Sequence, residues 1–195
     1  MRYERYGPAE AARLVREVIV PLYEDVYADL LGNPFDSTER FTERVTGYMS
    51  RPTFAMTAAY ADGVPVGQAF GCTLTSSRTW DALLTPVPDG FTGEAGGTRT
   101  FFLNEIMVRE QWRRQGIARR LHDLLLEGRG EERAALLVRQ ENDAAHAAYA
   151  SWGWQRAGLL RPFPDAPVYD VLVLDLKSRG TTDPDRLETG RHSWW

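Results

Sequence analysis

The chain has 195 residues, of which 43% are hydrophobic and 26% charged, and its net charge at pH 7 is −4. These values suit one domain with a sizeable core and argue against bulk attraction to nucleic acid or to an anionic membrane. The sole cysteine, Cys72, excludes an internal disulfide and a cysteine-based zinc cluster. The sequence has no signal-like N-terminus and no apolar run near the length that spans a bilayer, so we expect a cytoplasmic protein.

The first part of the chain is predicted to form an edge strand, two helical segments and a hairpin. Gly7-Pro8 is typical of a helix start, and Pro21 is expected to interrupt or kink that helix. Asp36 followed by Glu39 resembles a capping box at the start of the second helix. The expected ranges are 2–6 for the strand, 8–32 and 36–51 for the helical segments, and 54–60 and 64–75 for the hairpin.

Glycine and proline then mark less regular backbone. Gly67 and Gly71 indicate a bulge or a close approach in the second hairpin strand. Residues 76–97 are predicted to be an insertion with one helical turn at Trp80 to Leu84. A long loop between core strands often borders a binding site, so this insertion is a candidate wall of one.

The second part of the chain alternates strands and helices. Strands are expected at 99–109, 133–139, 154–160 and 168–176, with helices at 117–127 and 143–152. Strand–helix–strand units imply parallel neighbours, whereas hairpins imply antiparallel ones, so we predict an α/β fold with a mixed sheet of about seven strands and about four helices. The predicted domain covers 1–176, and 177–195 is expected to be a polar tail, although Trp194 and Trp195 are unusual at a free end.

The turn between the strand at 99–109 and the next helix has the features of an anion site. It reads Arg113-Arg114-Gln115-Gly116-Ile117-Ala118. A glycine lets the backbone approach an anion closely, and the following helix start presents free N–H groups. The two arginines add positive charge. This pattern fits a pyrophosphate cradle, and a solvated arginine cluster at a helix start is the alternative.

The same residues resemble the acyl-CoA signature of the GNAT N-acetyltransferase superfamily, through Arg113, Gly116 and Ala118 in an Arg-x-x-Gly-x-Ala pattern. Farther on, Asn142, Ala145, Tyr149 and Gly153-Trp154 resemble that family's downstream pattern, and Val138 stands where the family has a strand entering a V-shaped splay. The resemblance covers roughly 101–176. It implies a centrally splayed sheet and acetyl-CoA as cosubstrate.

The resemblance also implies a set of cosubstrate-binding residues. The amides from Gln115 to Ala118 would bind the pyrophosphate, Arg113 and Arg114 would add contacts, and the strand edge would pair with pantetheine. Asn142 would be a ligand, a helix N-cap, or both. The implied set is Ile106, Met107, Val108, Arg113, Arg114, Gln115, Gly116, Ile117, Ala118, Asn142 and Ala145.

Attack by an amine requires the loss of a proton, because a lysine-like amine has a pKa of about 10.4. Glu105 is the one carboxylate in the apolar strand and is therefore the candidate base. Strand alternation opposes this role, since it puts Asn104 with Ile106 and Val108 on one face and Glu105 with Met107 on the other. A β-bulge would re-aim either residue. Glu105, Asn104 and a water chain therefore remain alternatives.

Tyr149 matches the position where many family members have a tyrosine that acts as general acid toward the leaving thiolate. Proton transfer from a phenol with a pKa near 10 to a thiolate of pKa near 8.5 is uphill by about 2 kcal/mol, so hydrogen bonding to the thiolate is an equal alternative. The competing structural interpretation is a core tyrosine on the helix face shared with Ala145 and Trp152.

The sequence does not identify the acceptor. Its site is expected to draw on Tyr23, Asp25, Tyr27, Asp29, Phe35, Trp80 and Asp81, and acidic and aromatic groups of this kind would suit a cationic amine. We favour a small-molecule amine over a protein, with no nucleic-acid or membrane partner, and a homodimer is one option for assembly.

His122 and His146 are expected on solvated helix faces, and no metal-ligand spacing is present. The leading hypothesis is an acetyl-CoA-dependent N-acetyltransferase acting by direct attack in a ternary complex. A non-catalytic acyl-CoA-binding or regulatory module is the alternative. A nucleotide-binding protein ranks below both, because the sequence has neither a Gly-x-Gly-x-x-Gly turn nor a P-loop.

Overall fold

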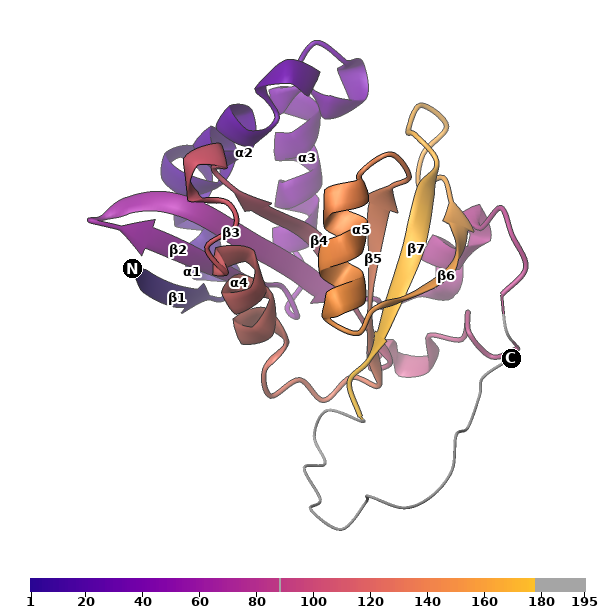
Figure 1. The fold of residues 1–195 in the computed structure, drawn as a ribbon. Helices are drawn as coiled ribbons and strands as arrows, with labels where there is room; N and C mark the ends of the chain where they lie inside the picture. Colours follow the sequence, from indigo (N-terminus) through magenta and orange to yellow (C-terminus); the bar gives the residue numbers. More distant parts are fainter. Residues whose placement is uncertain (88, 178–195) are drawn as a thin grey trace.

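The computed structural model describes residues 1–87 and 89–177, which form a seven-stranded mixed sheet covered on both faces (Figure 1). The predicted α/β architecture is confirmed. The strand order is β1-β2-β3-β4-β5-β7-β6, and only β4 and β5 pair in parallel. The strands are β1 (Arg2–Tyr6), β2 (Ala55–Ala61), β3 (Val64–Thr73), β4 (Thr100–Val108), β5 (Arg133–Arg139), β6 (Gln155–Leu160) and β7 (Tyr169–Asp175).

Five α-helices occur among the described residues, one more than predicted, because the first expected helix is divided. A π-helical turn, η1 (Val15–Ile19), separates α1 (Pro8–Leu14) from α2 (Val20–Val26). Pro21 has no N–H for the regular helical bond, which accounts for the break at this point. The others are α3 (Thr38–Met49), α4 (Ile117–Leu126) and α5 (Asp143–Ser151), with short 3₁₀ turns η2 (Ala28–Leu30), η3 (Pro34–Asp36), η4 (Ser77–Ala82), η5 (Ala95–Gly97) and η6 (Glu110–Trp112).

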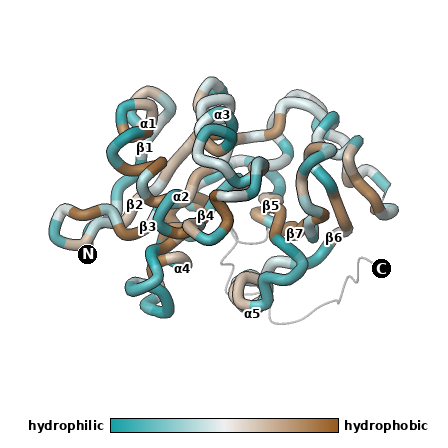
Figure 2. The backbone as a smooth tube through the Cα atoms, turned by 90° about the horizontal axis from the view of Figure 1, so that it is seen from above, coloured by the Kyte–Doolittle hydropathy of each residue, from teal (hydrophilic) through white to brown (hydrophobic). Residues whose placement is uncertain are grey.

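The helices and the insertion form layers on the two faces of the sheet, which Figure 2 separates when the molecule is seen from above. α1, α2 and α3 pack on β2–β4 through a cluster that includes Phe41, Val45 and Phe70. On the same face, the insertion packs on β5, β7 and β6 through Trp80 and Phe91. α4 and α5 cover the opposite face. One face of the sheet is therefore divided between α1–α3 and the insertion, and the candidate site lies between them.

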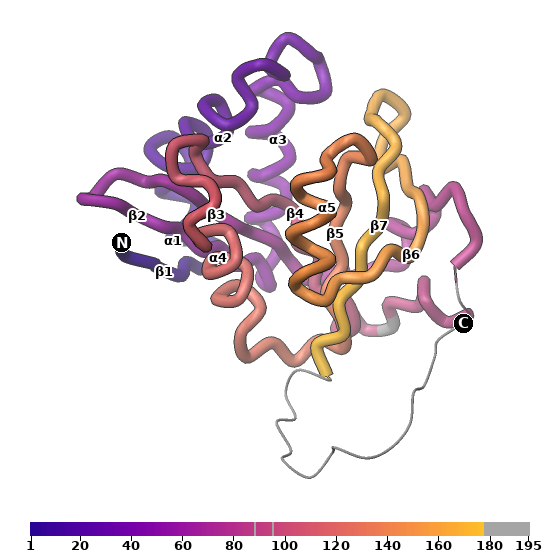
Figure 3. Tube along the Cα trace, viewed as in Figure 1, coloured from indigo at the N-terminus to yellow at the C-terminus, as the bar shows by residue number. Residues whose placement is uncertain are grey.

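The sheet opens at its centre. β4 and β5 pair only from Thr100 to Leu103 and then diverge, as the tube in Figure 3 shows. In the pairing of β4 with β3, Phe70 faces Glu105 and Gly71 faces Leu103, so Asn104 is an extra residue in a β-bulge. The splay implied by the family resemblance and the bulge therefore occur at the same residues.

Gly71 is the residue that permits this bulge. A Cβ atom at Gly71 would lie 2.2 Å from the Phe102 carbonyl oxygen, which is far inside van der Waals contact. The expectation of a close backbone approach at Gly71 is confirmed, and only glycine fits the present backbone there.

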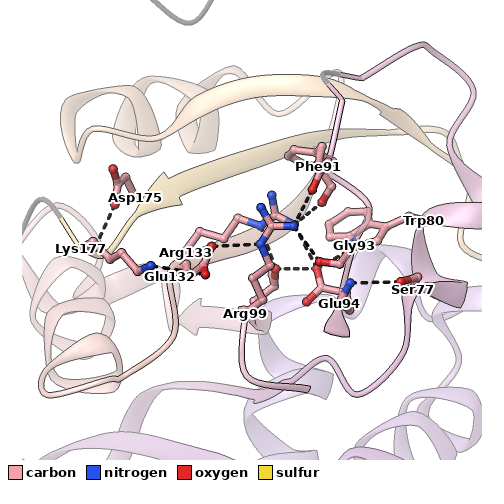
Figure 4. A network of polar contacts seen from close by, with 12 residues as sticks. Ser77, Trp80, Phe91, Gly93, Glu94, Arg99, Glu132, Arg133, Asp175 and Lys177 are labelled. Carbon is pink, nitrogen blue, oxygen red and sulfur yellow. Dashed lines mark hydrogen bonds and ion pairs between the residues drawn. The ribbon is translucent and has the colours of Figure 1, made fainter. Parts of the chain in front are cut away.

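Figure 4 shows how the insertion is fixed to the sheet. One carboxylate oxygen of buried Glu94 accepts hydrogen bonds from Trp80 Nε1 at 2.9 Å, Thr100 Oγ1 at 2.6 Å and Arg133 Nη2 at 3.0 Å. Leu84 N also donates to Leu159 O at 2.8 Å, which attaches the insertion to β6. The predicted helical turn is present as η4, which begins at Ser77 and not at Trp80, and these bonds fix the described part of the insertion to the sheet.

The predicted tail lies outside the described residues except for Lys177, and so do Trp194 and Trp195. Within 1–87 and 89–177, no helix combines the length and the apolar character needed to cross a bilayer.

Candidate active site

A cavity of about 570 Å³ lies at the point where β4 and β5 diverge. Tyr23 of α2, Tyr27 directly after it, and Arg44 and Tyr48 of α3 form one wall. Thr79 and Ala82 of the insertion form another. Tyr149 of α5 reaches the cavity from the opposite face of the sheet, which is possible because no strand of residues 1–87 and 89–177 closes the gap beyond Leu103. A reacting group in this cavity would therefore be accessible from both faces.

The bulge decides which β4 side chains enter the cavity. Leu103 and Val108 pack in the cluster beneath α4 and α5, whereas Met107 packs beneath α1–α3. Asn104 and Glu105 both line the cavity, although they are consecutive. Strict alternation, which separated these two side chains, is therefore wrong for this strand, because the extra residue shifts the phase of the side chains after it.

Glu105 has the environment of a base that titrates near neutrality. Burial raises the pKa of its carboxyl group to about 7, while a hydrogen bond from Tyr27 and the charge of Arg44 oppose the rise. Tyr27 Oη donates to Glu105 Oε1 at 2.8 Å. Burial and the nearby Glu105 charge raise the pKa of Tyr27 well above that of an ordinary phenol, so Tyr27 remains a donor.

Tyr149 lies close to Glu105 and keeps its proton. Its side chain is 7% exposed and packs edge-on against Trp152 and Trp154. Burial, together with the charge of Glu105, raises the pKa of the Tyr149 phenol. Tyr149 Oη has no hydrogen-bond partner among residues 1–87 and 89–177, so its proton is free to bond to a ligand. The core and cavity interpretations of Tyr149 both hold.

Asn104 is connected through Cys72 to Arg51, which lies just after α3. Cys72 Sγ lies 3.5 Å from Asn104 Oδ1, and Arg51 Nη1 lies 3.5 Å from the same sulfur. Burial raises the pKa of the Cys72 thiol, so it is uncharged at neutral pH. Asn104 is therefore a neutral polar group at the fork, suited to orienting a water or a substrate and not to accepting a proton.

The turn before α4 has the local geometry of an anion cradle. Gly116 is the N-cap of α4 with φ +77°, and a Cβ atom there would meet nothing within 4 Å. Arg114 also has a positive φ of 62°. The amides of residues 114–119 have no hydrogen-bond partner within the described part of the chain. Unpaired amides, open space and a helix N-terminus together fit a phosphate group.

The side chains of the turn before α4 make different contacts, and not all of them are available to an anion. Arg113 Nε donates to Val108 O at 3.1 Å, which fixes the turn to the end of β4. Gln115 Nε2 donates weakly to Gln111 O at 3.3 Å. Ile117, the first residue of α4, is buried in the cluster between this helix and the sheet, while Ala118 is half-buried. For Gln115, Ile117 and Ala118, the group that faces an anion is the backbone amide.

The β4 edge beyond the bulge has the open backbone that pantetheine pairing requires. Ile106, Met107 and Val108 bond to β3 on one side and have no β5 partner on the other. The Met107 side chain is buried, and the Val108 carbonyl is already engaged by Arg113. The edge therefore offers Ile106 and Met107 more freely than Val108.

Asn142 and Ala145 begin α5 at the other border of the fork. Asn142 Oδ1 accepts from Ala145 N at 3.0 Å, so the predicted N-cap is confirmed. Both residues line the cavity. Because Asn142 Oδ1 is used by the cap, its side-chain amide N–H groups are the part left for a ligand.

The structure corrects several expectations around the site. Asp36 does not cap α3, because Ser37 Oγ accepts from Arg40 N instead. Asp36 forms a two-pronged ion pair with Arg139 Nη2, at 2.7 and 2.8 Å. A capping pattern cannot distinguish Asp36 from the adjacent Ser37, and the partner of Asp36 is 103 residues away, so the sequence held no local signal for this pair.

The expectation that His122 lies on a solvated helix face is wrong, because its side chain is buried. Trp154 Nε1 donates a hydrogen bond to His122 Nε2 at 3.0 Å. His146 is also largely covered, with Nε2 3.5 Å from Asp170 Oδ2. Within the described ranges, no group of three or more His, Cys, Asp or Glu side chains could hold a metal ion.

The predicted acceptor residues divide into two groups. Tyr23, Tyr27 and Phe35 line the cavity. Asp25, Asp29, Trp80 and Asp81 do not, since Asp25 faces Arg109 at 3.6 Å and Trp80 belongs to the buried insertion network. Within the described part of the chain, the charged residues that do line the cavity, besides Asp36 and Glu105, are the arginines Arg44, Arg51, Arg78 and Arg139.

Known proteins of the same fold provide an independent comparison. A Pyrococcus horikoshii protein superposes with a TM-score of 0.62 at 13% identity, covering 89% of this chain and 98% of the other. A Brucella melitensis ribosomal-protein-alanine N-acetyltransferase gives 0.59 at 17%, covering 90% and 99%. A Thermoplasma acidophilum PaiA N-acetyltransferase, solved with coenzyme A, gives 0.53 at 12%, covering 90% and 99%. At these identities the likeness shows the fold.

No protein of curated function matches the sequence. The family model of the acetyltransferase (GNAT) family, in contrast, matches residues 19–154, more than half of the chain. That range includes the open fork, the bulge with Asn104 and Glu105, the cradle before α4, and Tyr149. The chain therefore belongs to the GNAT acetyltransferase family.

Proposed function

We propose that this protein transfers the acetyl group of acetyl-CoA to a primary amine of a small molecule, by direct attack within a ternary complex. The observation that carries the proposal is the pair formed by Glu105 and Tyr149. A carboxyl group with a pKa of about 7 and a protonated phenol line the same cavity at the fork. Such a pair can receive one proton and donate another.

The residues present fit acetyl-CoA. The unpaired amides from 114 to 119 and the open space above Gly116 suit a pyrophosphate, with each anion–dipole contact contributing on the order of 0.3–1 kcal/mol. The free edge at Ile106 and Met107 suits the peptide-like pantetheine arm. Bound in this way, acetyl-CoA supplies an acetyl group activated as a thioester.

The chain's own groups account for the proton movements. Glu105 takes the proton that the attacking amine must lose, directly or through a water held by Asn104. The nitrogen lone pair forms the new N–C bond while the C–S bond breaks, and the sulfur receives the bonding electrons. Tyr149 donates a hydrogen bond or its proton to that sulfur. The products are an N-acetyl amine and coenzyme A. If Tyr149 gives its proton to the sulfur, the proton taken by Glu105 returns to the phenolate through water. If Tyr149 only donates a hydrogen bond, coenzyme A leaves as the thiolate and Glu105 releases its proton to solvent.

Two measurements test this proposal. Thermal unfolding with acetyl-CoA, ATP or NAD is expected to show stabilisation by acetyl-CoA alone, and no stabilisation by millimolar acetyl-CoA would sink the proposal. Thiol release with acetyl-CoA and a panel of primary amines is then expected for at least one amine class. Binding without thiol release for any acceptor would favour the alternative, a non-catalytic acyl-CoA-binding module.

Tyr149→Phe separates binding from chemistry. The phenol faces the leaving sulfur in the proposal, so the variant should lose about 10² in kcat, with little change in the KM for acetyl-CoA. Trp152→Phe is the matched control, since Trp152 packs against the Tyr149 ring without lining the cavity. Full turnover by Tyr149→Phe would remove Tyr149 from the mechanism.

A further inference from the structure

The charge of the cavity does not suit a purely cationic acceptor. Among residues 1–87 and 89–177, four arginines line it, Arg44, Arg51, Arg78 and Arg139, against two acids, Asp36 and Glu105. Asp36 and Arg139 neutralise one another. Three guanidinium groups then remain for Glu105 alone, and Glu105 is itself partly protonated near neutral pH. A polyamine would meet net repulsion here.

Arg44 and Arg51 lie on one wall of the cavity with Tyr48 between them. Arg44 and Tyr48 are four residues apart on α3, so they share a helix face, and Arg51 follows shortly after the helix end. Arg44 Nη1 donates to Phe35 O at 2.7 Å, and its guanidinium carbon lies 4.6 Å from the centre of the Phe35 ring. Arg51 is held at the Cys72 sulfur. These contacts position both arginines without neutralising them.

Neither arginine has a carboxylate partner in the described ranges, and both line the cavity with guanidinium groups that have more N–H donors than these contacts use. Half-buried guanidinium groups without a counterion are costly. Their planar forks match the oxygens of a carboxylate or a phosphate. The missing counterion is therefore expected to arrive with a ligand.

The cosubstrate does not account for these arginines. The candidate pyrophosphate cradle precedes α4, which covers the opposite face of the sheet from α3 and the insertion. Arg44 and Arg51 are on the acceptor side of the fork, with Tyr27 and Glu105. The anion that would bind to Arg44 and Arg51 is therefore expected to be part of the acceptor.

We infer that the acceptor is an amine that also carries an anionic group, a carboxylate or a phosphate, and that Arg44 and Arg51 bind this group. The inference rests on the proposed acyl transfer and specifies its substrate class. The anion is bound on the α3 wall while the amine reaches Glu105 at the fork. Arg78 of η4, which is exposed and also lines the cavity, adds positive charge from the insertion side.

The test compares amines that differ only at the far end. For each chain length from two to six carbons, thiol release is measured with the alkylamine, the ω-aminocarboxylate, the ω-aminophosphonate and the diamine. α-Amino acids and their amides extend the series. A charge-assisted hydrogen bond contributes about 1.5–3 kcal/mol, so at least one anionic amine should exceed its alkylamine and diamine by roughly 10- to 100-fold in kcat/KM. The carboxylate and phosphonate members distinguish the two anions.

Arg51→Gln should reduce that preference by roughly tenfold, mainly through KM, and Arg51→Lys should give an intermediate value because it keeps the charge but not the fork. Arg51 is chosen over Arg44 because Arg44 also lowers the pKa of Glu105. Arg13→Gln, an exposed arginine on α1, is the control with the same loss of charge and should keep the preference. Diamines or alkylamines that match or exceed the anionic amines would overturn the inference.

A binding measurement separates this inference from the proposed function. The same amines are added to wild type and Arg51→Gln with coenzyme A present, and thermal unfolding is followed. Stabilisation by anionic amines only, lost in Arg51→Gln, would support the anion site even if no amine released thiol, in which case acyl transfer to amines would be the failed claim. Equal shifts for all amines, or for both proteins, would overturn the anion site itself.

Discussion

Glu105 and Tyr149 show how one cavity can favour opposite protonation states at adjacent groups. Burial raises the pKa of both, yet the outcomes differ. A carboxyl group raised to about 7 is poised to gain or lose a proton at physiological pH. A phenol raised above its usual value stays protonated and remains a donor. The hydrogen bond from Tyr27 keeps the carboxyl pKa from rising further.

The pH dependence of the rate tests the role of Glu105. As a base it must be ionised, so kcat should increase with pH up to about 7 and then level off. Tyr27, Arg44, Asp36 and the acceptor amine face or influence it, and the amine is expected to titrate at higher pH. Glu105→Gln should lose the limb at about pH 7 and roughly 10²–10⁴ in kcat.

Glu17→Gln, which alters an exposed carboxylate on η1, should leave the rate profile unchanged. An unaltered limb in Glu105→Gln would transfer the base role away from Glu105, toward a water oriented by Asn104. A lost rate with a retained limb would instead indicate that Glu105 positions substrate without accepting its proton.

At the scale of elements, the turn before α4 provides a test of the phosphate cradle. Gly116 and Gly128 flank α4, both have φ above +70°, and a Cβ at either would meet nothing within 4 Å. Alanine at either site should therefore cost a similar strain, about 1 kcal/mol of stability. Only Gly116→Ala should also place a methyl group in the phosphate position.

Calorimetric titration with acetyl-CoA is the measurement. Gly116→Ala is expected to weaken binding about tenfold or more, whereas Gly128→Ala should bind as wild type does. Equal affinities for the two variants would show that the phosphate does not approach Gly116. Equal losses would show that strain at the ends of α4, and not the methyl group, weakens binding.

The insertion depends on one buried carboxylate. Glu94 is 3% exposed and holds Trp80, Thr100 and Arg133 together. Glu94→Gln preserves the shape but leaves Arg133 without its counterion, so we expect a loss of about 3 kcal/mol in the free energy of unfolding. Urea denaturation measures this loss.

Glu132→Gln is the comparison for Glu94→Gln. It removes an exposed carboxylate paired with Arg99 and Lys177, where solvent screens the interaction, so its effect on unfolding should be much smaller. Similar losses for the two variants would mean that Glu94 acts no differently from a surface charge. Because η4 carries Thr79 and Ala82 of the cavity wall, Glu94→Gln should also raise the KM for the acceptor.

At the scale of the whole molecule, the strands and helices were largely predictable because their apolar periods are local. The strand at 133–139 and the hairpin around Asp62-Gly63 follow directly from such patterns. The π-helical turn before Pro21 was predictable only as a break, since the sequence does not say which bond replaces the missing one. His122 escaped prediction because its partner, Trp154, is brought to it only by tertiary packing.

The sequence allowed several residues of the site to be predicted, but not how their side chains are arranged. Motif spacing indicated Tyr149, and the composition and alternation of the strand indicated Glu105 and Asn104, but whether consecutive β4 residues share a face depends on a bulge. That bulge requires Gly71 on the neighbouring strand to approach Phe102, a contact between positions far apart in sequence. The positive charge of the acceptor cavity could not be predicted from the sequence either. Arg44, Arg51 and Arg139 lie apart along the chain, and only the fold brings them to one cavity.

Glu105 should also make the free energy of unfolding of the protein depend on pH. Its carboxyl pKa is about 7 in the folded state, against an ordinary value of 4.5, so the folded state binds the proton more tightly. This contribution to stability is fully present below the unfolded pKa and is lost as pH rises through about 7. The difference corresponds to at most about 3 kcal/mol, and water in the cavity will reduce it.

Glu105→Gln has no proton to lose, so it should lack this decline. Urea denaturation gives the free energy of unfolding of wild type and variant at pH 5 and at pH 8. The variant is compared with wild type at each pH, and any effect of the substitution that does not depend on pH cancels when the two comparisons are subtracted. The variant should gain up to about 3 kcal/mol on wild type between pH 5 and pH 8, while Glu17→Gln should gain nothing. A difference that is the same at both pH values would mean that the cavity does not raise the pKa of Glu105, and the carboxylate would then be too weak a base for the role assigned to it.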